Sequence, residues 1–178
     1  MMDAARADIE LEPLRQIHID WLLRHGIGVR SLISPLPVKL AHGVRHPDGR
    51  LDPPEAGECG ATWFAFEEAL PGDVVFWDPQ SGAIATQNGQ AIALGETAIH
   101  EAATYSFDGA LTLYPDPLTW LRGGRLFGCV IFDWSRAWWR LFDKPRVRLA
   151  DPSLVPLYER WMRPSVPSEV TVMLPEAA

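Results

Sequence analysis

Three aspartates each come directly after a run of residues that the sequence predicts to be a β-strand. Asp116 follows LTLYP, Asp133 follows FGCVIF and Asp151 follows VRLA. In an open α/β sheet, ligands bind at the carboxyl ends of the strands. Parallel strands would therefore bring the three carboxylates to one edge, where such oxygens hold Mg²⁺ against a phosphate. Alternatively, each aspartate is a helix N-cap, which the proline directly after Asp116 and after Asp151 favours.

Two arginines and the tryptophan between them form a second candidate binding group. On a helical wheel, Trp139 lies beside Arg136 and Arg140 at the border of the polar face. A ring placed in this way can stack on a nucleobase while the guanidiniums contact phosphate. The same trio is also typical of a helix interface or of an exposed cation–π contact. A contact with nucleic acid and a purely structural role are therefore both consistent with the sequence.

The segment 125–151 contains Asp133, Asp151 and the arginine–tryptophan trio, and it must position them. The apolar run 126–132 predicts a central strand that is covered on both faces. Behind Asp133, apolar residues recur at helical spacing until Lys144 and Pro145 end the helix. A short alternating strand and a last helical pattern follow. Strand, helix, strand and helix in this order predict a right-handed parallel crossover unit.

The whole chain, 1–178, is predicted to be a single α+β domain. Its expected parts are a mobile lead-in (1–12), a helix (13–26), an antiparallel meander (38–95), a βαβαβα half with a parallel sheet (111–163) and a C-terminal extension (164–178) with an edge strand at 169–174. Asn88-Gly89 predicts a tight hairpin between runs at 83–87 and 90–94. His18, on the apolar face of the first helix, is predicted to be a hydrogen-bonded core histidine. Whether the meander and the C-terminal half share one sheet is left open.

Composition places the chain in the ordinary globular class. Of its 178 residues, 47% are hydrophobic and 22% are charged. No apolar run approaches the length of a transmembrane helix, and residues 1–13 lack the pattern of a secretory signal. We therefore expect a cytoplasmic protein without a membrane partner. Cys129 is expected in the core and Cys59 at the surface, and a disulfide between them is not expected.

The net charge of −7 is unevenly distributed along the chain. Residues 51–121 contain no Lys or Arg, and their eleven acids are Asp52, Glu55, Glu58, Glu67, Glu68, Asp73, Asp78, Glu96, Glu101, Asp108 and Asp116. Residues 122–163 carry nine bases: Arg122, Arg125, Arg136, Arg140, Lys144, Arg146, Arg148, Arg160 and Arg163. An acidic surface would attract a basic partner and could present a DNA-like field. Alternatively, the acidic and basic segments attract each other within the fold.

Two segments resemble parts of known families. PGDVVFW, residues 71–77, is similar to the Gly-Asp-x-Val-Phe-Phe strand of NlpC/P60 cysteine peptidases. That resemblance implies a cysteine nucleophile, but Cys59 lies too close to the strand and the expected histidine is missing, so peptidase activity is not predicted. Residues 126–162 resemble half of a Toprim domain. Asp133-Trp134 stands where that family has Glu-Gly and the later Asp-x-Asp is absent, so no catalytic residue is carried over.

As a whole, the chain resembles small uncharacterised α+β proteins of proteobacterial genomes and their prophages. The resemblance rests on short ordered elements, proline-rich turns and the Asp-Trp-x-x-Ala-Trp pattern at 133–138. It implies an accessory role in a mobile element and brings no known activity.

These observations predict a non-enzymatic binding protein. A protein partner is expected, and nucleic acid, or a protein that handles nucleic acid, is the other target considered. The candidate binding residues are Asp116, Asp133, Asp151, Arg136, Trp139 and Arg140, and none is assigned a catalytic role. The alternative function is a nucleotide or magnesium–phosphate site at the carboxyl edge of the C-terminal strands, although no glycine-rich phosphate loop accompanies it. Mg²⁺ would be its cofactor, and no other cofactor is expected.

Overall fold

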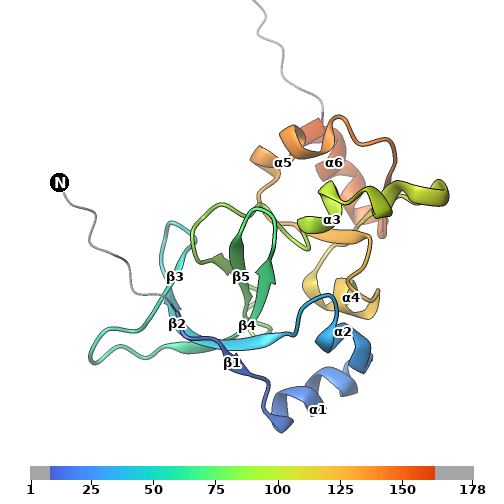
Figure 1. The fold of residues 1–178 in the computed structure, drawn as a ribbon. Coiled ribbons are helices and arrows are strands. Elements are labelled where there is room, and N and C mark those ends of the chain that lie inside the picture. Colours follow the sequence, from blue (N-terminus) through green and yellow to red (C-terminus); the bar gives the residue numbers. More distant parts are fainter. Residues whose placement is uncertain (1–8, 163–178) are drawn as a thin grey trace, which may run out of the picture.

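A computed structural model describes residues 9–162 of the chain, and its strands form two separate sheets. Helices pack around both sheets, so the predicted α+β class is confirmed (Figure 1). The meander and the C-terminal half do not share one sheet, which answers the question that the sequence leaves open. Within residues 9–162, no helix combines the length and the apolar character needed to cross a bilayer.

The first sheet is the predicted antiparallel meander. Its strands are β1 (Glu12–Pro13), β2 (Lys39–Arg45), β3 (Leu51–Asp52), β4 (Ala61–Glu68), β5 (Asp73–Trp77) and β6 (Ile84–Thr86). They pair in the order β1-β2-β4-β5-β6, with β3 added against β2, and every pairing is antiparallel. Along β4, Phe64 and Phe66 belong to one buried cluster, whereas Trp63 and Ala65 belong to another. Alternation along the strand therefore buries both faces of β4.

Two short helices, α1 (Gln16–Arg24) and α2 (Val29–Ile33), pack on the first sheet. Leu22 and Leu32 are buried in the same cluster as Phe64. The predicted helix 13–26 differs at its start, because Pro13 pairs with Lys39 as part of β1. The predicted lead-in 1–12 differs at its end, since Ile9 is only 7% exposed and packs in the cluster that contains Trp63.

The second sheet contains the predicted parallel strands. Its members are β7 (Ala93–Leu94), β8 (Leu111–Leu113), β9 (Gly128–Ile131) and β10 (Val147–Leu149), in the order β10-β8-β9-β7. β8 is parallel to both β9 and β10, whereas β7 is antiparallel to β9. All four residues of β9 are buried, which fits the predicted central strand, although the strand begins at Gly128 and leaves Leu126 and Phe127 exposed. Cys129 is buried in β9, Cys59 is exposed, and both thiols are free, as predicted.

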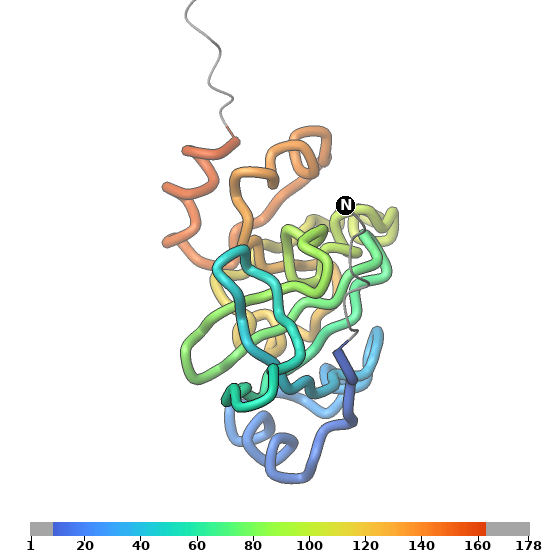
Figure 2. The backbone as a smooth tube through the Cα atoms, turned by 90° about the vertical axis from the view of Figure 1, so that its left-hand side faces the viewer, coloured from blue at the N-terminus to red at the C-terminus, as the bar shows by residue number. Residues whose placement is uncertain are grey.

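Short helices connect and cover the strands of this half. They are α3 (Thr97–His100), the 3₁₀ segment η1 (Ala102–Asp108), α4 (Pro117–Arg122), α5 (Trp134–Leu141), the 3₁₀ turn η2 (Pro152–Leu154) and α6 (Val155–Met162). Figures 1 and 2 show α5 and α6 at the end of the molecule opposite α1. The predicted edge strand at 169–174, within the extension 164–178, lies outside the described residues.

The predicted hairpin at Asn88-Gly89 is wrong. β6 pairs with β5 in the first sheet, and β7 pairs with β9 in the second, so residues 87–92 cross from one sheet to the other. The carboxylate of Asp73 holds this crossing segment by accepting the backbone N–H groups of Asn88, Gln90 and Ala91 at 2.8 to 3.0 Å. A buried acceptor 15 or more residues away therefore outweighs the local turn preference.

A single buried cluster runs across the junction of the two sheets. It contains Phe66 of the first sheet, Val130 of the second, and Trp120 of α4 between them. The Trp120 ring meets the edge of Phe66 at 5.5 Å, and its indole N–H donates to the Gly128 carbonyl at 2.8 Å. A side chain at Gly95 would collide with that indole, because a Cβ there would lie 2.9 Å from it. The joint between the sheets is therefore tightly packed.

Candidate functional site

The three aspartates singled out in the sequence do follow the carboxyl ends of parallel strands. Each carboxylate, however, bonds to the helix or 3₁₀ turn that begins at it. Asp116 accepts the backbone N–H of Thr119 at 2.9 Å and the Thr119 hydroxyl at 2.6 Å. Asp151 accepts the backbone N–H of Ser153 at 2.8 Å. The geometry therefore supports the N-cap interpretation.

Asp133 makes the densest set of these cap contacts. It accepts the Ser135 hydroxyl, the backbone N–H of Arg136 at 3.3 Å and the Arg136 Nε at 2.6 Å. Burial disfavours the ionised form, but the hydrogen bonds from Ser135 and Arg136 and the charge of Arg136 outweigh burial and lower the pKa of Asp133. Among residues 9–162, no three His, Cys, Asp or Glu side chains lie close enough together to hold a metal ion. The magnesium–phosphate site at this edge stays a prediction.

The cap interpretation predicts a specific mutational pattern at Asp133. We expect Asp133→Ala to lower the free energy of unfolding by about 1 kcal/mol, because the first turn of α5 loses its acceptor. Asp133→Asn should cost much less, since its amide oxygen can still accept the Arg136 N–H. Urea denaturation measures both values. Binding heat for Mg²⁺ with the unmodified protein, absent from Asp133→Asn, would instead support the metal site.

The trio Arg136, Trp139 and Arg140 is largely occupied within the fold. Besides Asp133, Arg136 contacts the carbonyls of Gly89 and Ala91, both at 3.2 Å. Arg140 lies 3.6 Å from a carboxylate oxygen of Glu96, a residue that is 0% exposed. The two guanidiniums thus tie α5 to the segment between β6 and α3. Trp139 is 67% exposed, and its ring packs on that of Trp138 at 4.8 Å. A contact with nucleic acid stays a prediction.

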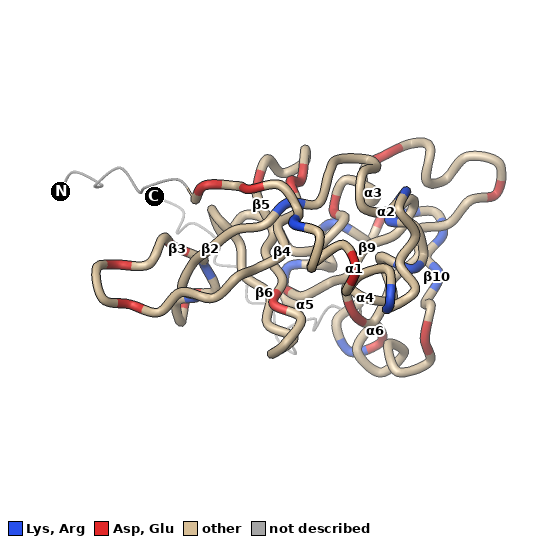
Figure 3. Tube along the Cα trace, turned by 90° about the horizontal axis from the view of Figure 1, so that it is seen from below, with Lys and Arg blue, Asp and Glu red and all other residues tan. Residues whose placement is uncertain are grey.

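Much of the charge asymmetry is also used inside the molecule. Three acids of the segment 51–121 are buried: Glu68, Asp73 and Glu96. Three others reach a basic side chain outside the segment, in the pairs Asp52–His46 (3.2 Å), Glu67–Lys39 (2.7 Å) and Asp108–Arg146 (2.7 Å). Acidic positions also lie in the long loop beyond β3 (Figure 3). The pair Asp108–Arg146 and the 3.6 Å approach of Arg140 to Glu96 join the acidic segment to the basic one, and a continuous acidic surface stays a prediction.

A buried ionisable pair, Glu68 and Arg125, lies at the junction of the sheets. Glu68 is 6% exposed and accepts the backbone N–H of Gly95 at 2.6 Å and the hydroxyl of Thr97 at 3.3 Å. Burial raises the pKa of Glu68 to about 7, although these hydrogen bonds and the charge of Arg125 oppose the shift. Arg125 is 5% exposed and donates to the carbonyls of Ser31 and Leu36. Their contacts link the first sheet to the second.

A cavity of about 280 Å³ adjoins the pair, and its lining mixes apolar side chains such as Leu126 and Phe127 with the polar Glu101 and Thr97. The Arg125 guanidinium lies over the rings of Phe66 and Trp120, at 5.5 and 5.3 Å from their centres. Both oxygens of Glu68 already accept hydrogen bonds from the chain. The pair therefore acts as a clamp between the sheets. The sequence contains no local signal for it, because Glu68 is only one of eleven acids in the segment 51–121.

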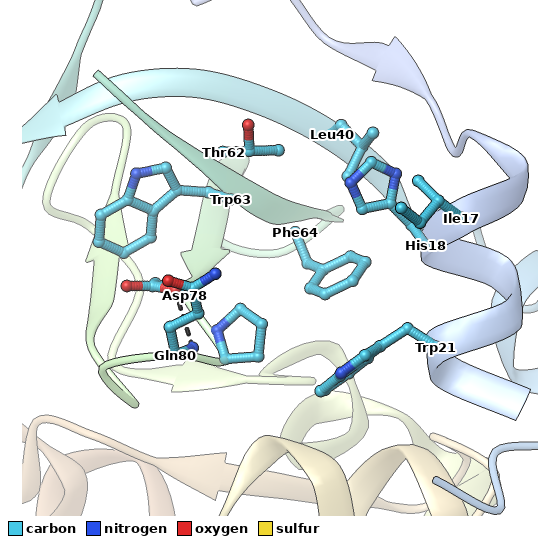
Figure 4. A pocket seen from close by; sticks show the side chains of 10 residues that line it. Ile17, His18, Trp21, Leu40, Thr62, Trp63, Phe64, Asp78 and Gln80 are labelled. Atoms are coloured by element: carbon cyan, nitrogen blue, oxygen red, sulfur yellow. Dashed lines mark hydrogen bonds between the residues drawn. The ribbon is translucent and has the colours of Figure 1, made fainter. Parts of the chain in front are cut away.

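A pocket of about 400 Å³, which we call the aromatic pocket, lies between α1, β4 and the turn after β5 (Figure 4). Its lining residues are Ile17, His18, Trp21, Leu40, Thr62, Trp63, Phe64, Asp78, Pro79 and Gln80. Concave, mainly apolar sites with a few polar groups are the usual form of a ligand-binding site.

Stacked rings make one wall of the aromatic pocket rigid. Trp21 and Phe64 stack at 6.0 Å with their planes 28° apart, and Phe64 stacks in turn on Trp77 at 5.7 Å. The His18 ring meets Phe64 edge-on at 6.0 Å. Each ring therefore limits the movement of the next, and the wall is in place before any ligand arrives. His18 Nδ1 is buried without a hydrogen-bond partner within the described chain, so the hydrogen-bonded core histidine predicted from the sequence is not found at this atom.

The turn after β5 supplies the polar end of the aromatic pocket. Asp78 accepts the backbone N–H of Gln80 at 2.9 Å, the bond drawn in Figure 4, and the Ser81 hydroxyl at 2.6 Å. The backbone N–H of Asp78 donates to Ala83, and its carbonyl accepts from Gly82. These bonds fix the direction of the carboxylate. The sequence identifies the turn and the apolar face of α1 separately, but it contains no signal that they meet.

Comparison with known proteins adds no relative: no family model, no curated protein and no solved structure matches the chain. The function must therefore be argued from the geometry of the pocket and of the surface around it.

Proposed function

We propose that the chain is a non-enzymatic binding protein that receives a side chain of a protein partner in the aromatic pocket. The observation that carries the proposal is the pocket itself, with stacked rings on one wall and an oriented carboxylate at its end. Such a site supplies apolar surface and orientation for a bound group. Asp78 bonds within its own turn, to the backbone N–H of Gln80 and the hydroxyl of Ser81, and these bonds orient its carboxylate.

Exposed apolar side chains on α1, which forms part of the pocket, and on the following α2 favour a protein partner over a free small molecule. Large apolar side chains are exposed along α1, α2 and the loop after them: Ile17 (69%), Leu23 (41%), Val29 (59%), Ile33 (61%) and Leu36 (38%). Ile17 also lines the aromatic pocket. Apolar side chains gathered on neighbouring elements are typical of a protein interaction surface. A partner lying over α1 could therefore insert one of its side chains into the pocket.

The pocket can be tested without knowing the partner. The probes are N-acetyl, N-methylamide derivatives of the twenty amino acids, which present each side chain to the full-length protein. We expect one group of these probes to shift the NMR signals of Trp21, Phe64 and Gln80, with dissociation constants on the order of 1 mM, as is usual for such small fragments.

Two matched substitutions make this test specific. Gln80→Trp places a large ring at the mouth of the aromatic pocket and should abolish the shifts, because Gln80 lines it. Gln90→Trp makes the same change at an exposed position outside the pocket and should leave them intact. If no probe shifts the pocket signals, or if Gln80→Trp binds as well as Gln90→Trp, the proposed function is wrong.

A further inference from the structure

The lining of the aromatic pocket has an uneven charge. Asp78 is its only carboxylate, and it contains no Lys or Arg. The carboxylate lies at the end of the pocket where Trp63 lies, with Phe64 and Trp21 further along the wall (Figure 4). A positively charged group would therefore meet a negative charge at one end and a wall of aromatic side chains beside it.

The Asp78 carboxylate is available to a ligand. Each of its oxygens accepts one hydrogen bond from its own turn, whereas an ionised carboxylate has about four acceptor positions in all. No Lys, Arg or His side chain forms an ion pair with it among residues 9–162. The turn thus holds the charge in place without neutralising it, so little ordering is needed when a cation binds.

The rings add a second attraction for the same class of group. A cation within about 6 Å of the face of Trp or Phe is attracted by the ring quadrupole, and Trp is the strongest of the aromatic side chains. Trp63 is held by a hydrogen bond from its indole N–H to the Gly43 carbonyl at 3.3 Å, and Trp21 is held by its stack on Phe64. A neutral group would leave the negative charge of Asp78 without a counter-ion, and an anion would be repelled by that charge.

We infer that the side chain received by the aromatic pocket is that of lysine, an alkylammonium group. Its four methylenes would lie against the apolar lining, beside Ile17 and Trp21, while the ammonium contacts Asp78. This inference rests on the proposed function and names the partner's side chain. The net charge of −7 adds a long-range attraction toward a basic segment.

The test compares probes that carry a positive charge with probes that lack it. Calorimetry on the full-length protein uses N-acetyl-lysine N-methylamide, the matched norleucine and Nε-acetyl-lysine derivatives, and n-butylammonium chloride. We expect the lysine probe to bind about tenfold more tightly than either neutral probe, and this advantage to shrink between low and high salt. n-Butylammonium should bind more weakly than the lysine probe, because it lacks the backbone that a protein partner presents.

Substitutions of two turn aspartates provide the control. Asp78→Asn keeps an acceptor for the Gln80 N–H but removes the charge, and it should reduce the affinity for the lysine probe about tenfold. Asp48→Asn makes the same change in another exposed turn and should leave the affinity unchanged. Thermal unfolding of both variants checks the fold.

The outcomes distinguish failure of the lysine inference from failure of the proposed function on which it rests. Neutral probes that bind as tightly as the lysine probe, with no effect of Asp78→Asn, would overturn the choice of lysine and leave the pocket as a binding site. n-Butylammonium binding more tightly than the lysine probe would overturn a protein source for the cation. Failure of every probe would overturn the proposed function as well.

Discussion

Replacing Asp73 by alanine is expected to lower the free energy of unfolding by about 4 kcal/mol. The carboxylate is 3% exposed and accepts four backbone N–H groups, those of Val74, Asn88, Gln90 and Ala91. Alanine would leave these donors without their acceptor where the segment crosses between the sheets. Urea denaturation of the unmodified protein and of Asp73→Ala measures the loss.

The control for Asp73 is an aspartate with a similar local role at the surface. Asp48 accepts the backbone N–H of Arg50 at 3.0 Å, and its side chain is 58% exposed. Water can replace that acceptor, so Asp48→Ala should cost less than about 1 kcal/mol. Hydrogen exchange adds a local measurement, in which the amides of Gln90 and Ala91 should lose protection only in Asp73→Ala. Equal losses of stability in the two variants would contradict the role given to Asp73.

Protonation of Glu68 is expected to make the stability of the protein depend on pH. Burial raises the pKa of this carboxyl from 4.5 to about 7 in the folded state. Below pH 4.5, Glu68 is protonated in both the folded and the unfolded chain, and its stabilising contribution is fully present. Between pH 4.5 and 7 the unfolded chain ionises first, so the contribution is lost as the pH rises through the folded pKa. The whole change corresponds to about 3 kcal/mol.

The measurement is a series of urea denaturation curves between pH 4 and pH 8 in the unmodified protein and in Glu68→Gln. Other carboxyls contribute equally to both proteins, so the difference between the two curves isolates Glu68. We expect Glu68→Gln to become more stable relative to the unmodified protein as the pH rises, because glutamine keeps an acceptor for Gly95 without becoming charged. Glu67→Gln changes the neighbouring carboxylate, which pairs with Lys39 at the surface, and serves as the control. A difference that does not change with pH would contradict the raised pKa of Glu68.

Both predictions concern the joint between the two sheets. Asp73 holds the chain as it leaves the first sheet, and Glu68 holds Gly95 and Thr97 just after β7 in the second. Trp120 fills the space between the sheets. Stability at this joint therefore depends on a few buried carboxyls as well as on apolar packing. The aromatic pocket lies elsewhere, against α1, so ligand binding and the pH dependence of stability can be tested separately.

The sequence by itself determined the elements whose signals lie within a few residues. Asp116-Pro117 marks the start of α4, and Asp133 marks the start of α5, because a carboxylate satisfies the first free N–H groups of a helix. The continuous apolar run before Asp133 identified β9 as a buried strand, since only a strand covered on both faces needs no polar alternation. These signals predicted that β8, β9 and β10 run parallel, as they do in the structure.

Only the tertiary structure decided how distant segments use the same residues. Asn88-Gly89 has the local preference for a hairpin, but the carboxylate of Asp73 and the pairing of β7 with β9 give that segment a different path. Arg136 is a residue type that often contacts nucleic acid, yet carbonyls some 45 positions away accept its hydrogen bonds. The aromatic pocket joins α1 to a turn about 60 residues later along the chain. Such contacts depend on the packing free energy of the whole chain, which no local pattern of residues records.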